Sequence, residues 1–110
     1  MDNALNGLFD AIARDFADWR SRGEYGSPND YDEFLGKLHV EEGRKYLKIV
    51  QDNGNQKLVW GFIVKEDDKK FLAGDILKAA GWSAPARNKA RGNILDEDFS
   101  MVRWTGPEYL

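Results

Sequence analysis

The chain has 110 residues, about the modal size of one domain and too short for two independent cores, so residues 1–110 are expected to form a single domain. Hydrophobic residues (42%) and aromatic residues (13%) supply enough apolar side chains for a packed interior. The lack of cysteine excludes disulfides and thiolate sites and fits a reducing cytoplasm. Neither a signal peptide nor an apolar stretch of membrane-spanning length is recognisable, so no membrane partner is expected.

Charge is distributed unevenly along the chain, although the formal net charge is only −3. Residues 37–91 contain 12 Lys/Arg against 7 Asp/Glu, whereas the two flanks together contain 4 against 12. A basic centre of this kind is typical of a surface that meets polyanions. The same pattern is expected if the acidic flanks fold over the centre and neutralise it, so both interpretations stay open.

The first expected element is an amphipathic helix from Leu5 to Trp19. Its apolar residues recur at the three- and four-residue spacing of one helix face, and its charged residues fall mostly on the other face. Asp2 or Asn3 is expected to cap its start, and Gly23 to end it. Because the polar face is net acidic, the apolar stripe is expected to join a core rather than a membrane.

A loop and three strands are expected next. Gly, Ser, Pro, Asn and Asp favour turns over residues 23–32, and Tyr25 and Tyr31 are expected to hold this loop in place. The strands are expected at residues 37–41, 44–51 and 57–64, with Asn53-Gly54 as the hairpin turn before the third. Apolar residues occupy both faces of the third strand, which predicts a central strand that is covered on each side.

Simple alternation along the third strand places Trp60 and Phe62 on one face. The N-terminal helix is the obvious cover for that face. Its residues Leu8, Ile12 and Phe16 are therefore expected to pack against Trp60 and Phe62.

Residues 71–79 are expected to form a fourth strand, broken or bulged at Gly74. Ser83 is expected to cap a short basic helix, with Pro85 in its first turn and Gly92 just past its end. The sequence thus predicts an α+β fold, in which the N-terminal helix packs on an antiparallel β-meander of three to five strands, closed by a short C-terminal basic helix. A helix followed by a small Sm-like or SH3-like barrel is the alternative, because Gly74 can form a corner.

Side chains suited to catalysis or metal binding are sparse. His39 is the only histidine, so His-based metal sites and nucleophile–base pairs lack partners, and a surface or edge position is expected for it. The runs Asp67-Asp68 and Asp96-Glu97-Asp98 offer oxygen ligands of the kind that Mg²⁺ prefers, but both fall in expected turns. We therefore expect no catalytic residue, no metal site and no cofactor.

Four cations and one aromatic ring form the candidate binding site: Lys78, Trp82, Arg87, Lys89 and Arg91. No acidic residue lies between positions 76 and 95. Because cations displace counterions from phosphates and a ring can stack on a base, this pattern favours binding of single-stranded nucleic acid or another polyanion. The alternative is structural: Arg87 and Arg91 stabilise the end of the short helix, and Trp82 fills the core.

Several stretches carry a resemblance to a known group: GRKYLKIVQ at 43–51, QKLVWGFIV at 56–64, GDILKAAGW at 74–82 and SAPARNKARGNILD at 83–96. They resemble a family of small, mostly uncharacterised proteins encoded by tailed bacteriophages, including marine phages. The resemblance spans roughly Gly43 to the C-terminus and carries over no catalytic residue. It implies a setting in an infected bacterium, either in the host cytoplasm or associated with the virion.

Together these features predict a non-enzymatic accessory protein of the phage type that binds nucleic acid or another polyanion weakly. The alternative is a protein–protein interaction or oligomeric structural protein that does not bind nucleic acid. Its partner would then be a phage or host protein, or a second copy of the chain in a homo-oligomer, since a small domain cannot bury all of its apolar surface internally.

Overall fold

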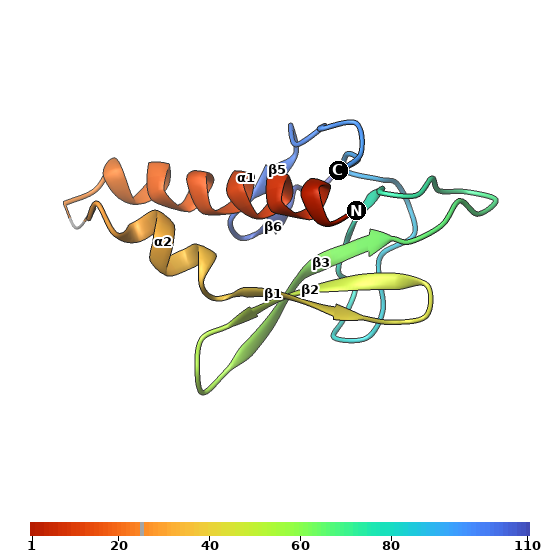
Figure 1. Cartoon of the computed structure of the whole chain (residues 1–110), viewed down its shortest axis with the longest axis horizontal. Coiled ribbons are helices and arrows are strands. Elements are labelled where there is room, and N and C mark those ends of the chain that lie inside the picture. The colour runs from red at the N-terminus through yellow and green to blue at the C-terminus, as the bar shows by residue number, and fades with distance from the viewer. Residues whose placement is uncertain (25) are drawn as a thin grey trace.

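The computed structural model describes residues 1–24 and 26–110 and confirms the α+β class (Figure 1). Two helices precede a four-stranded antiparallel sheet, and a two-stranded ribbon follows it. In chain order the elements are α1 (Asp2–Ser21), α2 (Asp30–Leu35), β1 (Leu38–Glu42), β2 (Tyr46–Asp52), β3 (Lys57–Val64), β4 (Ile76–Lys78), β5 (Val102–Arg103) and β6 (Gly106–Pro107). Within residues 1–24 and 26–110, no helix is long and apolar enough to cross a membrane.

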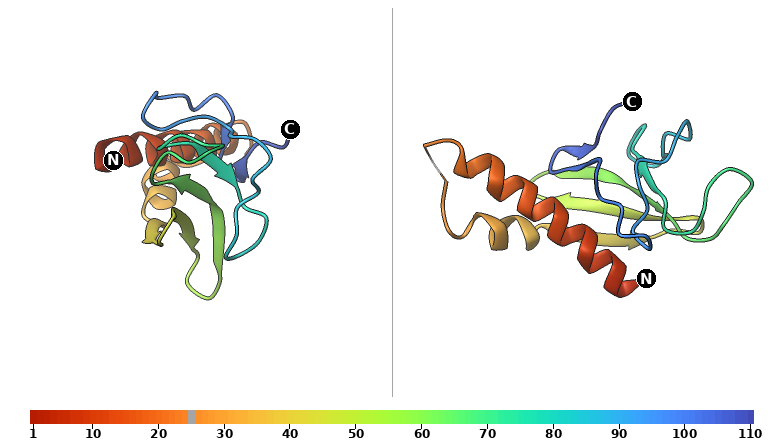
Figure 2. Two further views of the ribbon diagram at one scale, coloured as in Figure 1. Left: turned by 90° about the vertical axis from the view of Figure 1, so that its right-hand side faces the viewer. Right: turned by 90° about the horizontal axis from the view of Figure 1, so that it is seen from above.

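Helix α1 confirms the predicted amphipathic helix and extends beyond the predicted bounds at both ends. Leu5, Leu8 and Ile12 are buried along one face, which crosses the sheet diagonally (Figure 2). The N-cap is Met1, so the expectation of an Asp2 or Asn3 cap is wrong, and Asp2 instead lies in the first turn beside the positive end of the helix dipole.

Helix α2 was not expected: it begins at Asp30, within residues 23–32, where the sequence predicts a loop. The Asp30 carboxylate accepts a hydrogen bond from the Ser27 backbone N–H (2.8 Å), which fixes the chain where the helix begins. The Tyr31 hydroxyl donates to the Asp10 carboxylate of α1 (2.5 Å), so Tyr31 holds this segment as predicted. Tyr25 lies outside the described residues.

The sheet confirms the three predicted strands and the hairpin turn between β2 and β3. Its order is β1-β2-β3-β4, all antiparallel, so β3 is central as expected. The Asn53 N–H donates to the Gln56 carbonyl across the turn, and Gly54 adopts the positive φ (+89°) that favours glycine. Among the described strands β1 and β4 do not pair, so the sheet stays open and the barrel alternative is not adopted.

A β-bulge in β3 changes which residues face α1. Ile49 of β2 pairs with Gly61 and the next residue, Val50, pairs with Val59, so Trp60 has no counterpart in the described register of β2. The bulge shifts the alternation of side chains by one position. Trp60 therefore lies in the core under α1, whereas Phe62 lies in a second core on the opposite face. The expectation that both rings pack against the helix is wrong for Phe62.

The segment after β3 differs most from expectation. The fourth strand is confined to Ile76–Lys78, and Gly74 before it has a φ of +90°. Residues 79–92, all of them described, contain no helix, so the predicted short basic helix is wrong. Their backbone instead pairs with β4: the Ala86 N–H donates to the Lys78 carbonyl, and the Arg91 N–H to the Ile76 carbonyl. A helix of so few residues would leave those groups of β4 without partners.

The segment 79–92 and the C-terminal ribbon complete the two cores. Phe71, Phe62, Val64 and Leu77 form the second core on the face of the sheet opposite α1, with Ala79 and Ala90 packed against it. The β5–β6 ribbon contacts α1 and β3. The Trp60 indole N–H donates to the Arg103 carbonyl (2.7 Å), so the bulge also fastens the ribbon to the sheet.

The bulged position yields a stability prediction. Trp60→Ala should lower the free energy of unfolding by about 3–5 kcal/mol, because the side chain is only 4% exposed and its removal leaves a cavity. Leu58→Ala, on the same strand but 43% exposed, should change it by less than about 0.5 kcal/mol. Denaturant unfolding of both variants measures the difference, and equal midpoints would contradict the described register.

Candidate functional site

The structure gives different roles to the five residues that the sequence groups into one patch. Lys78 and Arg91 serve the fold, and Arg87 is paired with a carboxylate. Only Trp82 and Lys89 have exposed side chains that neither hold the fold together nor pair with a carboxylate. Trp82 is 48% exposed. The interpretation that Trp82 fills the core is therefore wrong.

Lys78 lies between the sheet and the C-terminal tail. Its amine donates to the Pro107 carbonyl (2.8 Å) and sits 3.9 Å from the centre of the Tyr109 ring. Burial lowers the pKa of this amine, and the nearby charge of Arg91 lowers it further. The Lys78 amine therefore holds the C-terminal tail against β4.

Arg91 is 3% exposed and has the same kind of structural role. Its guanidinium donates to the Glu108 and Lys89 carbonyls and to the Asn88 side-chain oxygen. These bonds fix a segment that has no regular secondary structure. They take the place of the backbone hydrogen bonds that a helix would have formed within the segment.

Arg87 fastens the same segment to the loop before β4. Its guanidinium pairs with the Asp68 carboxylate (3.0 Å), donates to the Tyr46 hydroxyl and lies 4.9 Å from the centre of the Phe71 ring. The pKa of Asp68 is lowered to about 2, chiefly by the Phe71 backbone N–H and then by the Lys70 N–H and Arg87. The hydrogen bond with Asp68 in turn raises the pKa of Arg87.

A hollow lies beside the Arg87–Asp68 ion pair, at the end of the sheet where β1 turns into β2. It has a volume of about 290 Å³, and Tyr46 and Phe62 contribute aromatic walls. The charged residues that line it are Arg44, Lys45 and Lys48 on the positive side and Glu41 and Glu42 on the negative side. The Lys48 amine lies 4.4 Å from the centre of the Trp82 ring, which brings Trp82 to the same end of the sheet. The arrangement puts cations and π-faces within reach of one ligand.

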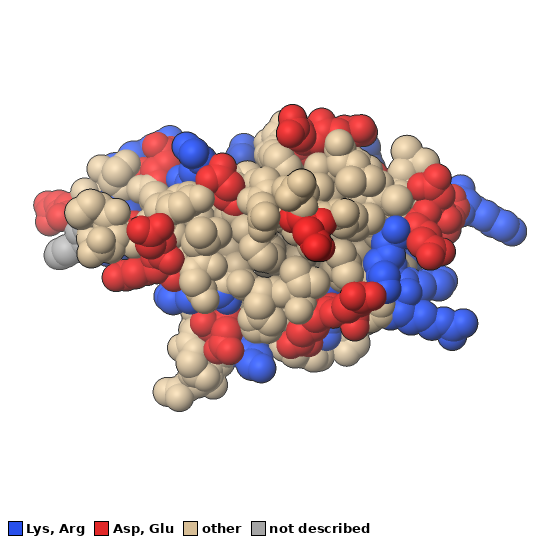
Figure 3. Space-filling model, in the orientation of Figure 1, with Lys and Arg blue, Asp and Glu red and all other residues tan. Residues whose placement is uncertain are grey.

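We call this region the basic end, defined as Arg44, Lys45, Lys48, Lys69 and Lys89. Within the described part of the chain, none of these side chains has an ion-pair partner. Figure 3 shows Lys and Arg side chains at the end of the molecule from which the β1–β2 hairpin and the loop over residues 65–73 project, next to a group of acidic side chains. At the other end, over α1 and α2, acidic side chains lie among some basic ones. Sequence reasoning missed the first three of these residues, although the run Arg44-Lys45-Tyr46-Leu47-Lys48 contains the signal.

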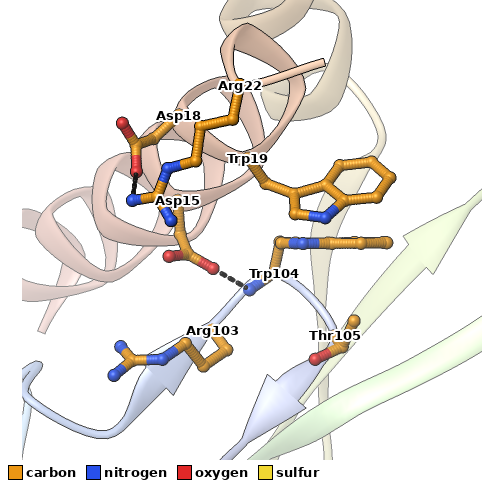
Figure 4. A pocket seen from close by; sticks show the side chains of 7 residues that line it. All are labelled: Asp15, Asp18, Trp19, Arg22, Arg103, Trp104 and Thr105. Atoms are coloured by element: carbon orange, nitrogen blue, oxygen red, sulfur yellow. Dashed lines mark hydrogen bonds and ion pairs between the residues drawn. The ribbon is translucent and has the colours of Figure 1, made fainter.

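A second surface hollow, of about 480 Å³, lies at the far end of α1 (Figure 4). Trp19 and Trp104 line it with their ring centres 4.8 Å apart, and the Asp15 carboxylate accepts a hydrogen bond from the Trp104 backbone N–H (2.9 Å). Asp18 and Arg22 close one side as an ion pair (2.6 Å). These contacts join the ribbon to α1, and we assign them to the fold.

The remaining candidates for chemistry have structural positions. His39 lies on edge strand β1 with its side chain 39% exposed, as expected, and its Nε2 is 3.5 Å from the Glu41 carboxylate. Asp67 accepts a hydrogen bond from the Ala73 N–H, and Asp98 from the Ser100 hydroxyl, so both acidic runs shape turns. Among the described residues, no group of three or more His, Asp or Glu side chains is placed to hold a metal ion.

The Asp68 fastening predicts a pH dependence. Because the folded pKa of Asp68 is about 2 and its ordinary value is 3.8, the carboxylate contributes stability that is complete above about pH 5 and is lost as the pH falls toward 2. Asp68→Asn should therefore be less stable than the wild type at pH 6, and the gap should narrow by pH 2. Thermal unfolding across this range, with Asp96→Asn as the control, measures it. A gap that is constant with pH would contradict the assignment.

The two ends of the predicted patch should respond differently to charge reversal. Arg91→Glu should cost roughly 3 kcal/mol or more, because it places a carboxylate beside buried carbonyl oxygens. Lys89→Glu makes the same charge change on an exposed side chain and should cost less than about 0.5 kcal/mol. Equal denaturation midpoints for the two variants would show that Arg91 has no structural role.

Comparison with known proteins identifies one matching family. A family model described as "Family of unknown function (DUF7717)" matches residues 2–109. No curated protein and no solved structure gives a significant match. Since the family model spans both helices, the sheet, the basic end and the ribbon, the chain belongs to the DUF7717 family of unknown function.

Proposed function

We propose that the protein is a non-enzymatic binding module for single-stranded nucleic acid or a similar polyanion, and that the basic end is its binding surface. The observation that carries the proposal is the hollow in which Arg44, Lys45 and Lys48 surround the aromatic walls of Tyr46 and Phe62. Cations without ion-pair partners release counterions from phosphates, and the exposed face of Trp82 offers a base a surface for stacking.

The surface differs from the patch that the sequence alone suggests. Trp82 and Lys89 are kept, Lys78 and Arg91 are removed because the fold uses them, and Arg44, Lys45 and Lys48 are added. Arg87 contributes by holding Tyr46 and Asp68 beside the hollow. The neighbouring acids limit the net field, because Glu41 and Glu42 line the same hollow and Glu66 and Asp67 lie close to Arg44 and Lys45. The binding is therefore modest and independent of sequence.

The proposed setting is a bacterium infected by a tailed phage, with the protein in the host cytoplasm or on the virion. It rests on the resemblance carried by residues 43–51 and 74–96. The polyanion in that setting is phage or host nucleic acid.

Charge reversal at the hairpin tests the proposal. The wild type should be retained by single-stranded DNA at low salt, with a log–log salt slope near −2 to −3 for about three or four phosphate contacts. Arg44→Glu combined with Lys45→Glu should remove most of this binding, because both side chains border the hollow. Fluorescence anisotropy of a labelled oligonucleotide across a salt series measures affinity and slope.

The matched control is Lys37→Glu combined with Lys57→Glu. It changes the net charge by the same amount on exposed side chains outside the basic end, so binding should fall much less. Equal losses in the two double variants would place the effect in net charge alone. If the wild type retains no DNA or RNA at low salt, the proposal fails and a protein partner becomes the better account.

A further inference from the structure

Asparagine is followed by glycine at two places in the chain, Asn6-Gly7 and Asn53-Gly54. In such a pair the backbone nitrogen of the glycine can attack the side-chain carbonyl carbon of the asparagine, because glycine has no Cβ to crowd its nitrogen. Both asparagines are exposed. The two pairs therefore differ in their backbone setting rather than in their access to water.

The Asn53-Gly54 pair lies in the turn of the β2–β3 hairpin, which projects from the sheet (Figure 1). Residues 53–56 are all exposed, and none of them belongs to either core. A Cβ on Gly54 would meet no atom of the described residues within 4 Å beyond its chain neighbours. The backbone of this turn is therefore free to rotate without disturbing any packed side chain.

The side-chain hydrogen bonds that restrain this pair lie at the surface. The Gly54 N–H donates to the Asp52 carboxylate (2.9 Å), and the Asn53 side-chain oxygen accepts a hydrogen bond from the Gln51 side-chain amide (3.1 Å). Both bonds are made within the hairpin and are open to water, so they can break while the sheet stays intact. The Gly54 nitrogen can then lose its proton and react.

The Asn6-Gly7 pair lies near the start of α1 and is held differently. Helical geometry bonds the Gly7 N–H to the carbonyl four residues earlier and fixes the backbone of Asn6. A Cβ on Gly7 would lie 3.4 Å from the Phe99 ring, and the neighbouring Leu5 and Leu8 are buried. Reaction at Asn6 therefore requires the packed start of α1 to unfold.

We propose that Asn53 is a site of spontaneous deamidation in the folded protein and that α1 protects Asn6 from the same reaction. The Gly54 nitrogen loses its proton to hydroxide and bonds to Cγ of Asn53, the Cγ–Nδ2 bond breaks, and the side-chain nitrogen leaves as ammonia. Water then opens the cyclic imide. Cleavage of its N–Cγ bond gives aspartate, and cleavage of its bond between nitrogen and the α-carbonyl carbon gives isoaspartate. One water is consumed and one ammonia is released, without oxidation or reduction.

The modification changes both the charge and the length of the turn. Either product adds a carboxylate next to Asp52, and isoaspartate also routes the main chain through Cβ and Cγ. The Asn53 N–H bond to the Gln56 carbonyl and the pairing of Asp52 with Lys57 depend on the present length of the turn. The hairpin therefore loosens as Asn53 converts. The turn lies at the opposite end of β2 from the basic end, and the inference does not rest on nucleic-acid binding.

Incubation of the folded full chain at pH 6 and at pH 8, followed by peptide mass spectrometry, measures both sites in one sample. Asn53 should convert at least about tenfold faster than Asn6, because opening the start of a packed helix is costlier than opening a surface turn. Conversion should be faster at pH 8, since the glycine nitrogen must lose a proton. Equal rates at the two sites, or no conversion of Asn53, would overturn the proposal.

The same incubation in denaturant shows whether the fold causes the difference. Once α1 is unfolded the two Asn-Gly pairs are chemically alike, so Asn6 should convert at a rate close to that of Asn53. If Asn6 stays slow in the unfolded chain, the protection assigned to α1 is wrong.

Asn53→Gln is the matched variant for the effect on the hairpin. Glutamine keeps the amide, but its longer side chain has to close a larger ring, which forms more slowly. Before incubation the variant and the wild type should have similar denaturation midpoints, whereas after incubation only the midpoint of the wild type should fall. Fragmentation that distinguishes isoaspartate from aspartate should find isoaspartate in the aged wild type. An equal fall in both proteins would contradict the role assigned to Asn53.

Discussion

Strand β3 must be shielded from water on both faces, and most of the structure follows from that requirement. It is the central strand, and its residues from Trp60 to Val64 are buried without interruption. Helix α1 covers one face, and the segment 79–92 together with Phe71 covers the other. An eight-residue strand of this kind cannot be stabilised from one side only, because every second apolar side chain would then face solvent.

The bulge at Trp60 allows two aromatic side chains of β3 to face opposite cores. The large ring is placed under α1, and its N–H reaches the ribbon, while Phe62 turns to the opposite core. Gly61 follows the bulge because a Cβ there would lie 2.9 Å from the Leu77 carbonyl, so the neighbouring strand could not approach as closely. The bulge thereby joins three parts of the chain that are distant in sequence.

The sequence was informative where one physical signal dominated. The helical spacing of α1, the alternation in β1 to β3 and Asn53-Gly54 predicted those elements because local preference and burial agree there. The sequence was misleading over residues 83–92, where residues that favour a helix instead form backbone hydrogen bonds with β4. The bulge and α2 left no clear periodic signal, since one adds a single residue to a strand and the other spans under two turns.

The candidate site shows the same limit more sharply. Grouping Lys78, Arg87 and Arg91 by sequence was reasonable for charge, but nothing in the sequence marks which cations will meet a buried carbonyl. Arg44 and Lys45 come to the surface because they sit in a hairpin turn, where side chains cannot be drawn into either core. Lys78 and Arg91 are therefore tied to carbonyl oxygens of the fold, whereas Arg44 and Lys45 at the turn remain at the surface.

The acidic helices and the basic end lie at opposite ends of the molecule, which gives the molecule an electric dipole. Its longest dimension is 46 Å, several times the screening length of roughly 8 Å at physiological salt, so the two ends act on their surroundings as independent charges. Near a strongly negative surface the molecule experiences a torque that turns the β1–β2 hairpin inward and α1–α2 outward. The end that then faces away from such a surface carries the acidic side chains of α1 and α2, so it would repel a second negatively charged body.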